Sequence, residues 1–475
     1  MSMTAKRERT VGGPVVPQPR ISVIGTGYLG ATHAAAMAEL GFDVAGVDSD
    51  HQKVDALQRG RLPFYEPGLP ELIAKHVRSG RLRFTADLAE AVALADVHFI
   101  CVGTPQLSTS FGANLGYVES AVRAVAASLT HDGLIVGKST VPVGTAARLR
   151  EVMADALPEG IRAELVWNPE FLREGKAVED TLSPDRLVFG GTGVESEAEL
   201  RTIYARPIAD GTPVLVVDLA TAELVKVSAN AFLATKISFI NAISEVCDAA
   251  GADVGQLADA LGHDRRIGRQ FLNAGLGFGG GCLPKDIRAL MHRSAELGAH
   301  SAGRLLQQVD EINMGQRQRV IDQTLAACGG SVLNRRVGIL GAAFKPFTDD
   351  VRDSPALNVA AALHLRGAQA VVFDPQAGAT ARRMFPTLGY AQSTEEAVSG
   401  ADVVLVLTEW PEFTSANAVK LGALVTSRVV IDARNCLDAE AWSAAGWTVY
   451  TMGRLPVGPG DGAVVPLAEL VGVMH

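Results

Sequence analysis

The sequence lacks three features, and each lack excludes a class of protein. It has only five cysteines among 475 residues, which are too few and scattered for a disulfide framework and suit a reducing cytosol. It has no apolar run approaching the roughly 18 residues of a membrane span. It has no excess of positive charge, because the formal net charge is -9 at pH 7. Nucleic acid and anionic membrane are therefore excluded as main partners.

The length of the chain predicts more than one domain. At 475 residues it is too long for a single ordinary hydrophobic core. Its 48% hydrophobic and 20% charged residues are typical of a globular protein in water. Residues 1–20 contain basic residues, proline and glycine but no apolar stretch like that of a secretory signal. We expect them to form a flexible tail.

Short apolar runs alternate with helical patterns in the first third of the chain. ISVIG leads into a glycine-rich turn and a helix, and DVAGVD, ADVHFICVGTP and GLIVGKST supply later strands. Strands that alternate with helices predict a parallel sheet covered on both faces. We therefore predict a Rossmann domain over residues 21–215.

A similar alternation returns near the C-terminus. RVGILG, AVVFDP, ADVVLVLT and RVVIDARN repeat the order and spacing of the first unit, which predicts a second Rossmann-like domain over residues 326–475. Between the two, residues 216–325 lose the strand signal. The predicted fold class is α/β, with two doubly wound domains joined by a central helical domain.

The central domain contains one long predicted helix. In TAELVKVSANAFLATKISFINAISEVCDAAG, apolar residues recur three and four positions apart. Such a helix can form a dimer seam between the α/β domains of two copies. A helix that is hydrophobic on most sides is also suited to burial within the monomer.

A glycine-rich turn in the first domain predicts a dinucleotide site. Gly25, Gly27 and Gly30 follow a predicted strand and open a predicted helix, which places a pyrophosphate at the helix N-terminus. Asp48 closes the second strand, where its carboxylate can bind the ribose 2′-hydroxyl and repel the phosphate of NADP. Strand, turn, helix and later acid together predict NAD as the cofactor.

Cys282 lies in the segment GFGGGCLPKD, where glycines and residues capable of catalysis are most concentrated. Pro284 fits the first turn of a helix, so Cys282 is predicted at a helix N-terminus beside Lys285, where a thiolate is stabilised. The neighbouring glycines let a substrate approach the backbone closely. This setting favours a nucleophile over the inert buried cysteine that is the usual alternative. Asp286 follows, although an acid also suits the first turn of any helix.

Further polar residues stand where they can face the same site. Lys226 and Asn230 are four apart on the long predicted helix, so both can point to one side. A lysine there could stabilise an oxyanion, or it could be solvated at the edge of the helix. The segment NPEFLREG offers the carboxylates of Glu170 and Glu174, which could orient water or bind sugar hydroxyls, although surface turns also carry glutamate.

The ends of other strands carry polar and cationic residues. Thr104 and Thr140 follow strands, and ligands of open α/β sheets lie at the carboxyl ends of strands, where polar turn formers are also common. In the C-terminal unit, Lys345 takes the place of the helix start of the glycine fingerprint, and it could meet a second diphosphate as a point charge. Arg352 and Arg434 add cations near strand ends, with ordinary salt bridges as the alternative.

These motifs together resemble the UDP-glucose/GDP-mannose dehydrogenase family, from about residue 21 to about residue 440. The matching segments are VIGTGYLG, VDSD, YEPGLPEL, CVGTP, KSTVPVGT, NPEFLREG, ELVKVSANAFLATKISFIN, DRRIG, GFGGGCLPKD, AFKPFTDDVRDSP, VFDP and TEWPEF. The resemblance implies a cytosolic enzyme that uses NAD twice. It implies that the C6 alcohol of a nucleotide sugar becomes an aldehyde, which Cys282 captures as a thiohemiacetal. A second hydride transfer then leaves a thioester that water hydrolyses.

The resemblance also implies roles for individual residues. The catalytic positions are matched by the nucleophile Cys282, the oxyanion stabiliser Lys226, the water-positioning Asp286, Glu170 for thioester hydrolysis, and Thr140 and Asn230, which orient water and substrate. The NAD positions are matched by Gly25, Gly27, Tyr28, Leu29, Gly30, Asp48, Lys53, Thr104, Thr140, Glu174, Lys285 and Arg352. The nucleotide-sugar positions are matched by Glu170, Phe171, Leu172, Arg173, Glu174, Lys226, Asn230, Arg266, Phe271, Asn273, Gly277, Phe278, Gly279, Cys282, Phe344, Lys345 and Arg434. Arg266 is expected to reach across a subunit interface, in a homodimer or higher homo-oligomer formed through the central helix.

Smaller details favour UDP-glucose as substrate and UDP-glucuronate as product. SPDRLVFG, DRRIG and SANAFLATKISFIN resemble the UDP-glucose members, whereas Leu283 resembles the GDP-mannose members. GDP-mannose or a UDP-N-acetylhexosamine is therefore the main competing substrate. A non-catalytic nucleotide-sugar binding protein is a second possibility, against which the intact Cys282, Lys226 and Asp286 argue. A cysteine hydrolase is a third, and it is disfavoured because no histidine with a pairing role lies near Cys282 in sequence. We expect no metal site.

Overall fold

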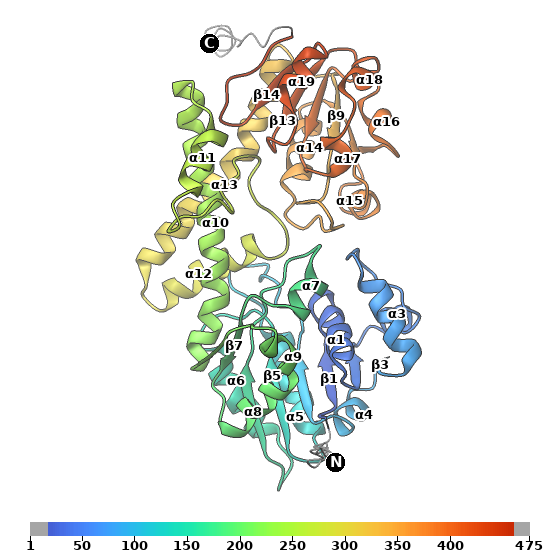
Figure 1. The fold of residues 1–475 in the computed structure, drawn as a ribbon, viewed down its shortest axis with the longest axis vertical. Coiled ribbons are helices and arrows are strands. Elements are labelled where there is room, and N and C mark those ends of the chain that lie inside the picture. The colour runs from blue at the N-terminus through green and yellow to red at the C-terminus, as the bar shows by residue number, and fades with distance from the viewer. Residues whose placement is uncertain (1–17, 460–475) are drawn as a thin grey trace, which may run out of the picture.

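Two α/β domains lie at opposite ends of a helical region in the computed structural model, which describes residues 18–459 (Figure 1). The first sheet has the strand order β3-β2-β1-β4-β5-β6-β7-β8, and the second has the order β11-β10-β9-β12-β13-β14. In each sheet the first strand lies inside, and later strands are added on both sides of it, as in doubly wound sheets. The predicted fold class is confirmed. The expected N-terminal tail lies mostly outside the described residues, as does the end of the expected C-terminal domain.

The first sheet is built from short strands that are buried on both faces. Each of the strands β1, β2 and β4 has four residues, and all of them are buried. Helices cover both sides of the sheet. All neighbouring strands are parallel except β6 and β7, which pair antiparallel through Trp167 and Gly190. The strands are β1 (Ile21–Ile24), β2 (Val44–Val47), β3 (Leu82–Thr85), β4 (Val97–Ile100), β5 (Gly133–Gly137), β6 (Ala163–Trp167), β7 (Leu187–Gly190) and β8 (Val214–Val217). The helices are α1 (Tyr28–Leu40), α2 (His51–Gln58), α3 (Leu69–Ser79), α4 (Leu88–Ala93), α5 (Gly116–Ser128), α6 (Thr145–Ala156), α7 (Ala177–Leu182), α8 (Val194–Ile203) and α9 (Ala205–Ala209).

The second sheet is parallel throughout and has a separate hydrophobic core. Its strands are β9 (Arg336–Leu340), β10 (Gln369–Phe373), β11 (Gly389–Tyr390), β12 (Val403–Val406), β13 (Val429–Asp432) and β14 (Thr448–Thr451). Its helices are α14 (Pro355–Leu365), α15 (Gly378–Met384), α16 (Thr394–Val398), α17 (Pro411–Thr414), α18 (Ala418–Gly422) and α19 (Ala439–Ala444).

The segment that carries Lys345 in the second domain is not helical. Lys345 does not begin a helix, because residues 341–354 form a loop after β9 and α14 begins only at Pro355. Pro346 disfavours the helical conformation of the lysine that precedes it. The helix instead begins where Ser354 accepts a hydrogen bond from the Leu357 amide and proline occupies the first helical position.

The predicted long central helix is confirmed as α10 (Leu219–Ala250), which has 32 residues. It begins where the Asp218 side chain accepts a hydrogen bond from the Thr221 amide, and it ends at Gly251, whose φ is 70°. The other central helices are α11 (Val254–Gly262), α12 (Leu283–Glu296) and α13 (His300–Ala327). Among the described residues, no helix combines the length and apolarity of a membrane-crossing segment.

Candidate active site

The glycine turn after β1 leaves an open position at the start of α1. Gly25 has a φ of 88°, and a Cβ on Gly30 would lie 1.7 Å from the Gly25 carbonyl oxygen. Only glycine therefore lets α1 pack this closely on β1. Around Gly27, apart from its chain neighbours, no heavy atom of the described residues lies within 4 Å of its Cβ position. This open position, next to the first helical residues Tyr28 and Leu29, fits a diphosphate at the helix N-terminus.

Asp48 follows β2 at the edge where such sheets bind ribose hydroxyls. Its Oδ2 accepts hydrogen bonds from the Thr26 amide (3.0 Å), the Thr26 hydroxyl (3.1 Å) and Lys53 Nζ (2.8 Å). Burial alone raises the pKa of Asp48, but the hydrogen bonds from Lys53 and from backbone amides outweigh burial and hold the pKa below its usual value. The carboxylate is therefore charged and oriented before any ligand arrives.

Two helices bring the expected catalytic side chains together. Lys226 and Asn230 lie one turn apart on α10, and Cys282 is the residue directly before α12. Lys226 Nζ pairs with Glu170 Oε1 at 2.8 Å, and both side chains are largely buried. Asn230 Nδ2 donates to Asp286 Oδ2 at 2.7 Å. The charges of Asp286, Glu170 and Lys226 all act on the Cys282 thiol, so these residues form one cluster, which we call the cysteine cluster.

Thr140 borders the cysteine cluster. It follows β5 and lines a small cavity together with Asp286 and Arg293. Its carbonyl accepts a hydrogen bond of 2.7 Å from the buried hydroxyl of Thr104, which follows β4. The segments that follow the neighbouring strands β4 and β5 are thereby joined.

The prediction that Cys282 is a stabilised thiolate is wrong for the protein without ligands. Cys282 is accessible to solvent, but the dense protein around it limits hydration. This desolvation, followed by the charges of Asp286 and Glu170, raises the pKa of Cys282 to about 12 against the opposing charge of Lys226. Lys285 does not compensate, because its Nζ pairs with Asp286 Oδ1 at 2.7 Å. The thiol is therefore protonated at neutral pH and must lose its proton as it attacks.

The loop of residues 168–175 between β6 and α7 forms another wall of the site, and we call it the substrate loop. Glu170 Oε2 accepts a hydrogen bond of 2.8 Å from the Leu172 amide. Arg173 is turned toward α7, where it pairs with Asp180, so its guanidinium is engaged in the free protein. The expected site residues on this loop are Glu170, Phe171, Leu172, Arg173 and Glu174.

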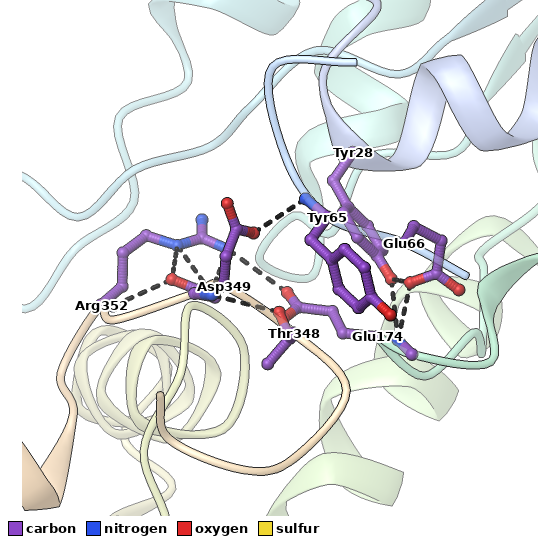
Figure 2. Close-up of polar contacts among 9 residues, drawn as sticks. Tyr28, Tyr65, Glu66, Glu174, Thr348, Asp349 and Arg352 are labelled. Carbon is purple, nitrogen blue, oxygen red and sulfur yellow. Dashed lines mark hydrogen bonds and ion pairs between the residues drawn. The ribbon is translucent and has the colours of Figure 1, made fainter. Parts of the chain in front are cut away.

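Glu174 joins the substrate loop to the C-terminal domain (Figure 2). Its carboxylate accepts hydrogen bonds of 3.3 Å from the Thr348 hydroxyl and from Arg352, which also pairs with Asp350. Burial, and then the charge of Asp350, raises the pKa of Glu174 to about 7, while Arg352 and Lys345 oppose the rise. Glu174 therefore changes charge near neutral pH at a contact between the two domains. Two residues expected to bind NAD, Glu174 and Arg352, are paired with each other here.

The segment that leads to Cys282 is held from the C-terminal side. Arg434 donates to the Gly277 carbonyl at 2.9 Å and to the Phe344 carbonyl at 3.2 Å. Asn313 on α13 exchanges two hydrogen bonds, of 2.7 and 3.0 Å, with the backbone of Phe278. A Cβ on Gly277 would lie 2.3 Å from the Asn313 side chain, so glycine is required there. The expected sugar-binding residues gathered here are Gly277, Phe278, Gly279, Phe344 and Arg434.

Three expected substrate residues form a separate group between α11 and α12. The side chain of Arg266 is 89% exposed and pairs with Asp264. Phe271 is exposed and has a φ of 64°, and Asn273 accepts a hydrogen bond of 2.7 Å from Arg269. Within one chain, these contacts do not connect the group to the cysteine cluster.

Several buried polar residues that hold the site were missed in the sequence. Lys138 Nζ donates to Asn168 Oδ1 at 3.0 Å and to the Tyr204 hydroxyl at 3.3 Å, and burial lowers the pKa of Lys138 to about 8. Glu66 and Asn313 are equally buried. Lys138 and Glu66 lie in the segments KSTVPVGT and YEPGLPEL, which match the family. These motifs could have pointed to both residues, but spacing in the sequence could not predict their hydrogen-bond partners. Asn313 stands in no motif.

Three domain models of one family match the chain. The NAD binding domain of the UDP-glucose/GDP-mannose dehydrogenase family matches residues 19–208. The central domain of that family matches residues 220–315, and its UDP binding domain matches residues 338–439.

Individual proteins match along nearly the whole chain. The UDP-glucose 6-dehydrogenase TuaD of Bacillus subtilis is 41% identical over 439 residues, which are 92% of this chain and 93% of that protein. A UDP-glucose 6-dehydrogenase of Rhizobium meliloti is 39% identical over 437 residues, or 92% of this chain and 99% of that protein. The solved structure of a UDP-glucose dehydrogenase from Pyrobaculum islandicum gives a TM-score of 0.85 at 36% identity and covers 93% of this chain and 99% of that one.

Proposed function

Because the chain belongs to the UDP-glucose/GDP-mannose dehydrogenase family, we propose that it oxidises UDP-glucose to UDP-glucuronate with two molecules of NAD. UDP-glucose, two NAD and one water give UDP-glucuronate, two NADH and three protons. The observation that carries this proposal is the cysteine cluster, in which a nucleophile, a buried lysine and two carboxylates meet. The identity of 41% and 39% to two UDP-glucose 6-dehydrogenases supports UDP-glucose as the sugar.

The proposed division of labour follows the three matched units. Residues 21–215 would bind NAD, residues 216–325 would carry Lys226 and Cys282, and residues 326–475 would bind the UDP group. The open glycine turn and the charged Asp48 fit NAD. When bound there, NAD would accept a hydride from C6 of the sugar in each of the two oxidations. Cytosolic location is part of the same proposal.

The first half of the reaction converts the C6 alcohol to an aldehyde. The hydroxyl proton must leave as C6 is oxidised, and a water held by Asp286 is the proposed acceptor. Asp286 is fixed for this role by hydrogen bonds from Asn230 and Lys285, of 2.7 Å each. Thr140 lines the same cavity as Asp286, where its hydroxyl can orient that water.

The second half proceeds on Cys282. Its sulfur bonds to the aldehyde carbon while the thiol proton moves to the carbonyl oxygen through the water at Asp286, which gives a neutral thiohemiacetal. Lys226 stabilises the negative charge that develops on that oxygen. Loss of a second hydride and a proton leaves a thioester. Glu170, released from Lys226 by the substrate, activates the water that displaces sulfur and forms the carboxylate.

We also propose that the enzyme works as a homodimer through α10. Three apolar side chains on this helix are exposed and lie seven positions apart, Phe232 (66%), Phe239 (48%) and Val246 (60%). Residues seven apart share one helix face, so they form a stripe that a second copy can cover. Arg266 would then reach the substrate of the neighbouring subunit.

The stoichiometry of NADH formation tests the proposed function. With purified protein, excess NAD and limiting UDP-glucose, we expect two NADH for each UDP-glucose consumed and glucuronate as the only sugar product. One NADH per sugar would contradict the four-electron reaction. Activity with GDP-mannose or an acetylated UDP-hexosamine, and none with UDP-glucose, would contradict the assigned substrate.

The role of Asp48 gives a second expected result. Asp48→Ala should lower the ratio of kcat/KM with NAD to kcat/KM with NADP by roughly tenfold or more, because a charge that repels the 2′-phosphate is lost. Asp55→Ala, on the exposed face of α2, serves as the matched control and should leave the ratio unchanged. An unchanged ratio for Asp48→Ala would remove the aspartate from the ribose site.

A further inference from the structure

Glu66 is a buried carboxylate outside the cysteine cluster, and it lies on the segment between α2 and α3. Its side chain is bonded to two other segments of the NAD-binding domain. It accepts hydrogen bonds from the amides of Gly175 (2.6 Å) and Ala177 (2.7 Å) and from the hydroxyl of Tyr28. Figure 2 shows the Tyr28 ring and the Glu66 carboxylate directed toward each other beside the loop that carries Glu174.

The two amides fix the end of the substrate loop. Gly175 is the last residue of that loop, and Ala177 is the first residue of α7. A carboxylate that accepts amides at the start of a helix is stabilised there and in turn orders the preceding chain. Because Glu170 and Glu174 lie within the five residues before Gly175, their positions depend on this anchor. A Cβ on Gly175 would lie 2.9 Å from the Phe347 carbonyl, so the anchored end is also pressed against the C-terminal domain.

The tyrosine links the same anchor to the glycine turn. Tyr28 is the first residue of α1, directly after Gly27, and its hydroxyl also accepts a hydrogen bond of 3.1 Å from the Gly175 amide. Burial, and then the hydrogen bond to Glu66, raises the pKa of Tyr28 well above its usual value. The hydroxyl therefore keeps its proton and donates to Glu66. The ring is held by Phe64, with 5.0 Å between ring centroids.

The adjacent residue extends this connection to the other domain. The Tyr65 amide donates to Asp349 Oδ1 at 2.9 Å (Figure 2). The short segment around Glu66 thus contacts the helix start at the glycine turn, the substrate loop and the loop of residues 341–354. The amides of Gly175 and Ala177 donate hydrogen bonds to Glu66, which lies more than 100 positions away in sequence. The contact is therefore tertiary and is not a local helix cap.

We propose that Glu66 is a positioning residue that couples the glycine turn, through Tyr28, to the substrate loop that carries Glu170 and Glu174. NAD at the glycine turn orders the start of α1, and the Tyr28–Glu66–Gly175 connection transmits that order to the loop. This inference rests on the proposed function for its kinetic consequence. Its structural consequence, protection of the substrate loop by NAD, requires only that NAD binds.

Amide hydrogen exchange and kinetics on Glu66→Gln test the proposal. The glutamine keeps the size of the side chain but replaces one accepting oxygen by a donor. We expect exchange of the Gly175 and Ala177 amides to accelerate roughly tenfold or more, with no further protection on adding NAD. We expect kcat to fall roughly 10- to 100-fold, because Glu170 loses its position, while KM for NAD changes less than about threefold.

Tyr28→Phe is the second variant and removes one hydroxyl only. It should leave exchange of the substrate loop near the wild-type rate without NAD but abolish most of the slowing that NAD causes. Tyr390→Phe is the matched control, because it removes a tyrosine hydroxyl bonded to the Phe385 carbonyl at 3.0 Å in the C-terminal domain. The control should keep both the exchange pattern and kcat of the wild type.

Two results would overturn the proposal. One is Glu66→Gln with unchanged exchange at Gly175 and Ala177. The other is faster exchange over the whole domain with a lower kcat and higher KM values for both substrates, which is the signature of a purely structural residue. If Glu66→Gln does not fold, NAD-dependent protection that persists in Tyr28→Phe overturns the coupling. Failure of the wild type to oxidise UDP-glucose refutes the proposed function alone, because the exchange experiment uses NAD without sugar.

Discussion

Cys282→Ser is expected to lower the steady-state rate of NADH formation roughly 10³-fold or more, since removal of a covalent nucleophile costs this much or more in other enzymes. A serine hydroxyl is a far weaker nucleophile than a thiol. The burial and the neighbouring carboxylates that raise the pKa of Cys282 also oppose ionisation of a hydroxyl. Binding of UDP-glucose should stay within about threefold of the wild type, because the substitution is nearly isosteric.

The measurement is NADH formation under saturating substrates, together with calorimetric titration of UDP-glucose. Cys328→Ser, at the C-terminal end of α13 and away from the cluster, is the matched control and should keep wild-type turnover. Unimpaired turnover of Cys282→Ser would exclude the thiohemiacetal and thioester. Loss of both UDP-glucose binding and turnover would show that the substitution disturbs the fold of the segment that carries Cys282.

Lys226→Met is expected to combine a catalytic and a structural loss. Removing the cation beside the developing oxyanion should lower kcat roughly 10²- to 10³-fold. Because Glu170 would be left as an unpaired, largely buried charge, the variant should also lose about 3–5 kcal/mol of unfolding free energy. Turnover measured with NAD and UDP-glucose, and denaturant unfolding, report the two losses separately.

A double variant separates these effects. Lys226→Met combined with Glu170→Gln removes both charges, so it should recover much of the stability but none of the activity. Lys420→Met is the matched control, since its lysine pairs with Glu395 at 2.7 Å but both side chains are exposed. It should cost less than about 1 kcal/mol. If Lys226→Met kept wild-type kcat, the lysine would have only a structural role.

Local sequence signals predicted the parts of the site that are set by neighbours in the chain. The turn from Gly25 to Gly30 needs only a strand, glycines and a helix, and Pro284 predicted the start of α12. No helix forms at Lys345, because the following proline disfavours it and the chain starts its helix only at the cap of Ser354.

Pairings between distant segments could not be predicted from spacing. Lys226 and Glu170 are 56 positions apart, and nothing in either local pattern indicates that they form an ion pair. The pKa of Cys282 was mispredicted for a related reason. A helix N-terminus and Lys285 are local features that lower a thiol pKa. Burial by the surrounding fold is the largest cause that raises it, followed by the charges of Asp286 and of Glu170, which comes from another domain of the chain. Charge balance in the cluster is therefore a property of the tertiary fold.

The hydrogen bond between Tyr65 and Asp349 joins residues 284 positions apart. At the usual pace of translation, about 5–20 residues per second, a ribosome needs roughly 15 to 60 seconds to proceed from the first residue to the second. The N-terminal domain has its own hydrophobic cores and can fold during this interval. A nascent chain can therefore form its glycine turn well before the residues of the C-terminal domain that contact Tyr65 and Glu174 are made. Translation products that end after the N-terminal domain should accordingly bind NAD without reducing it to NADH.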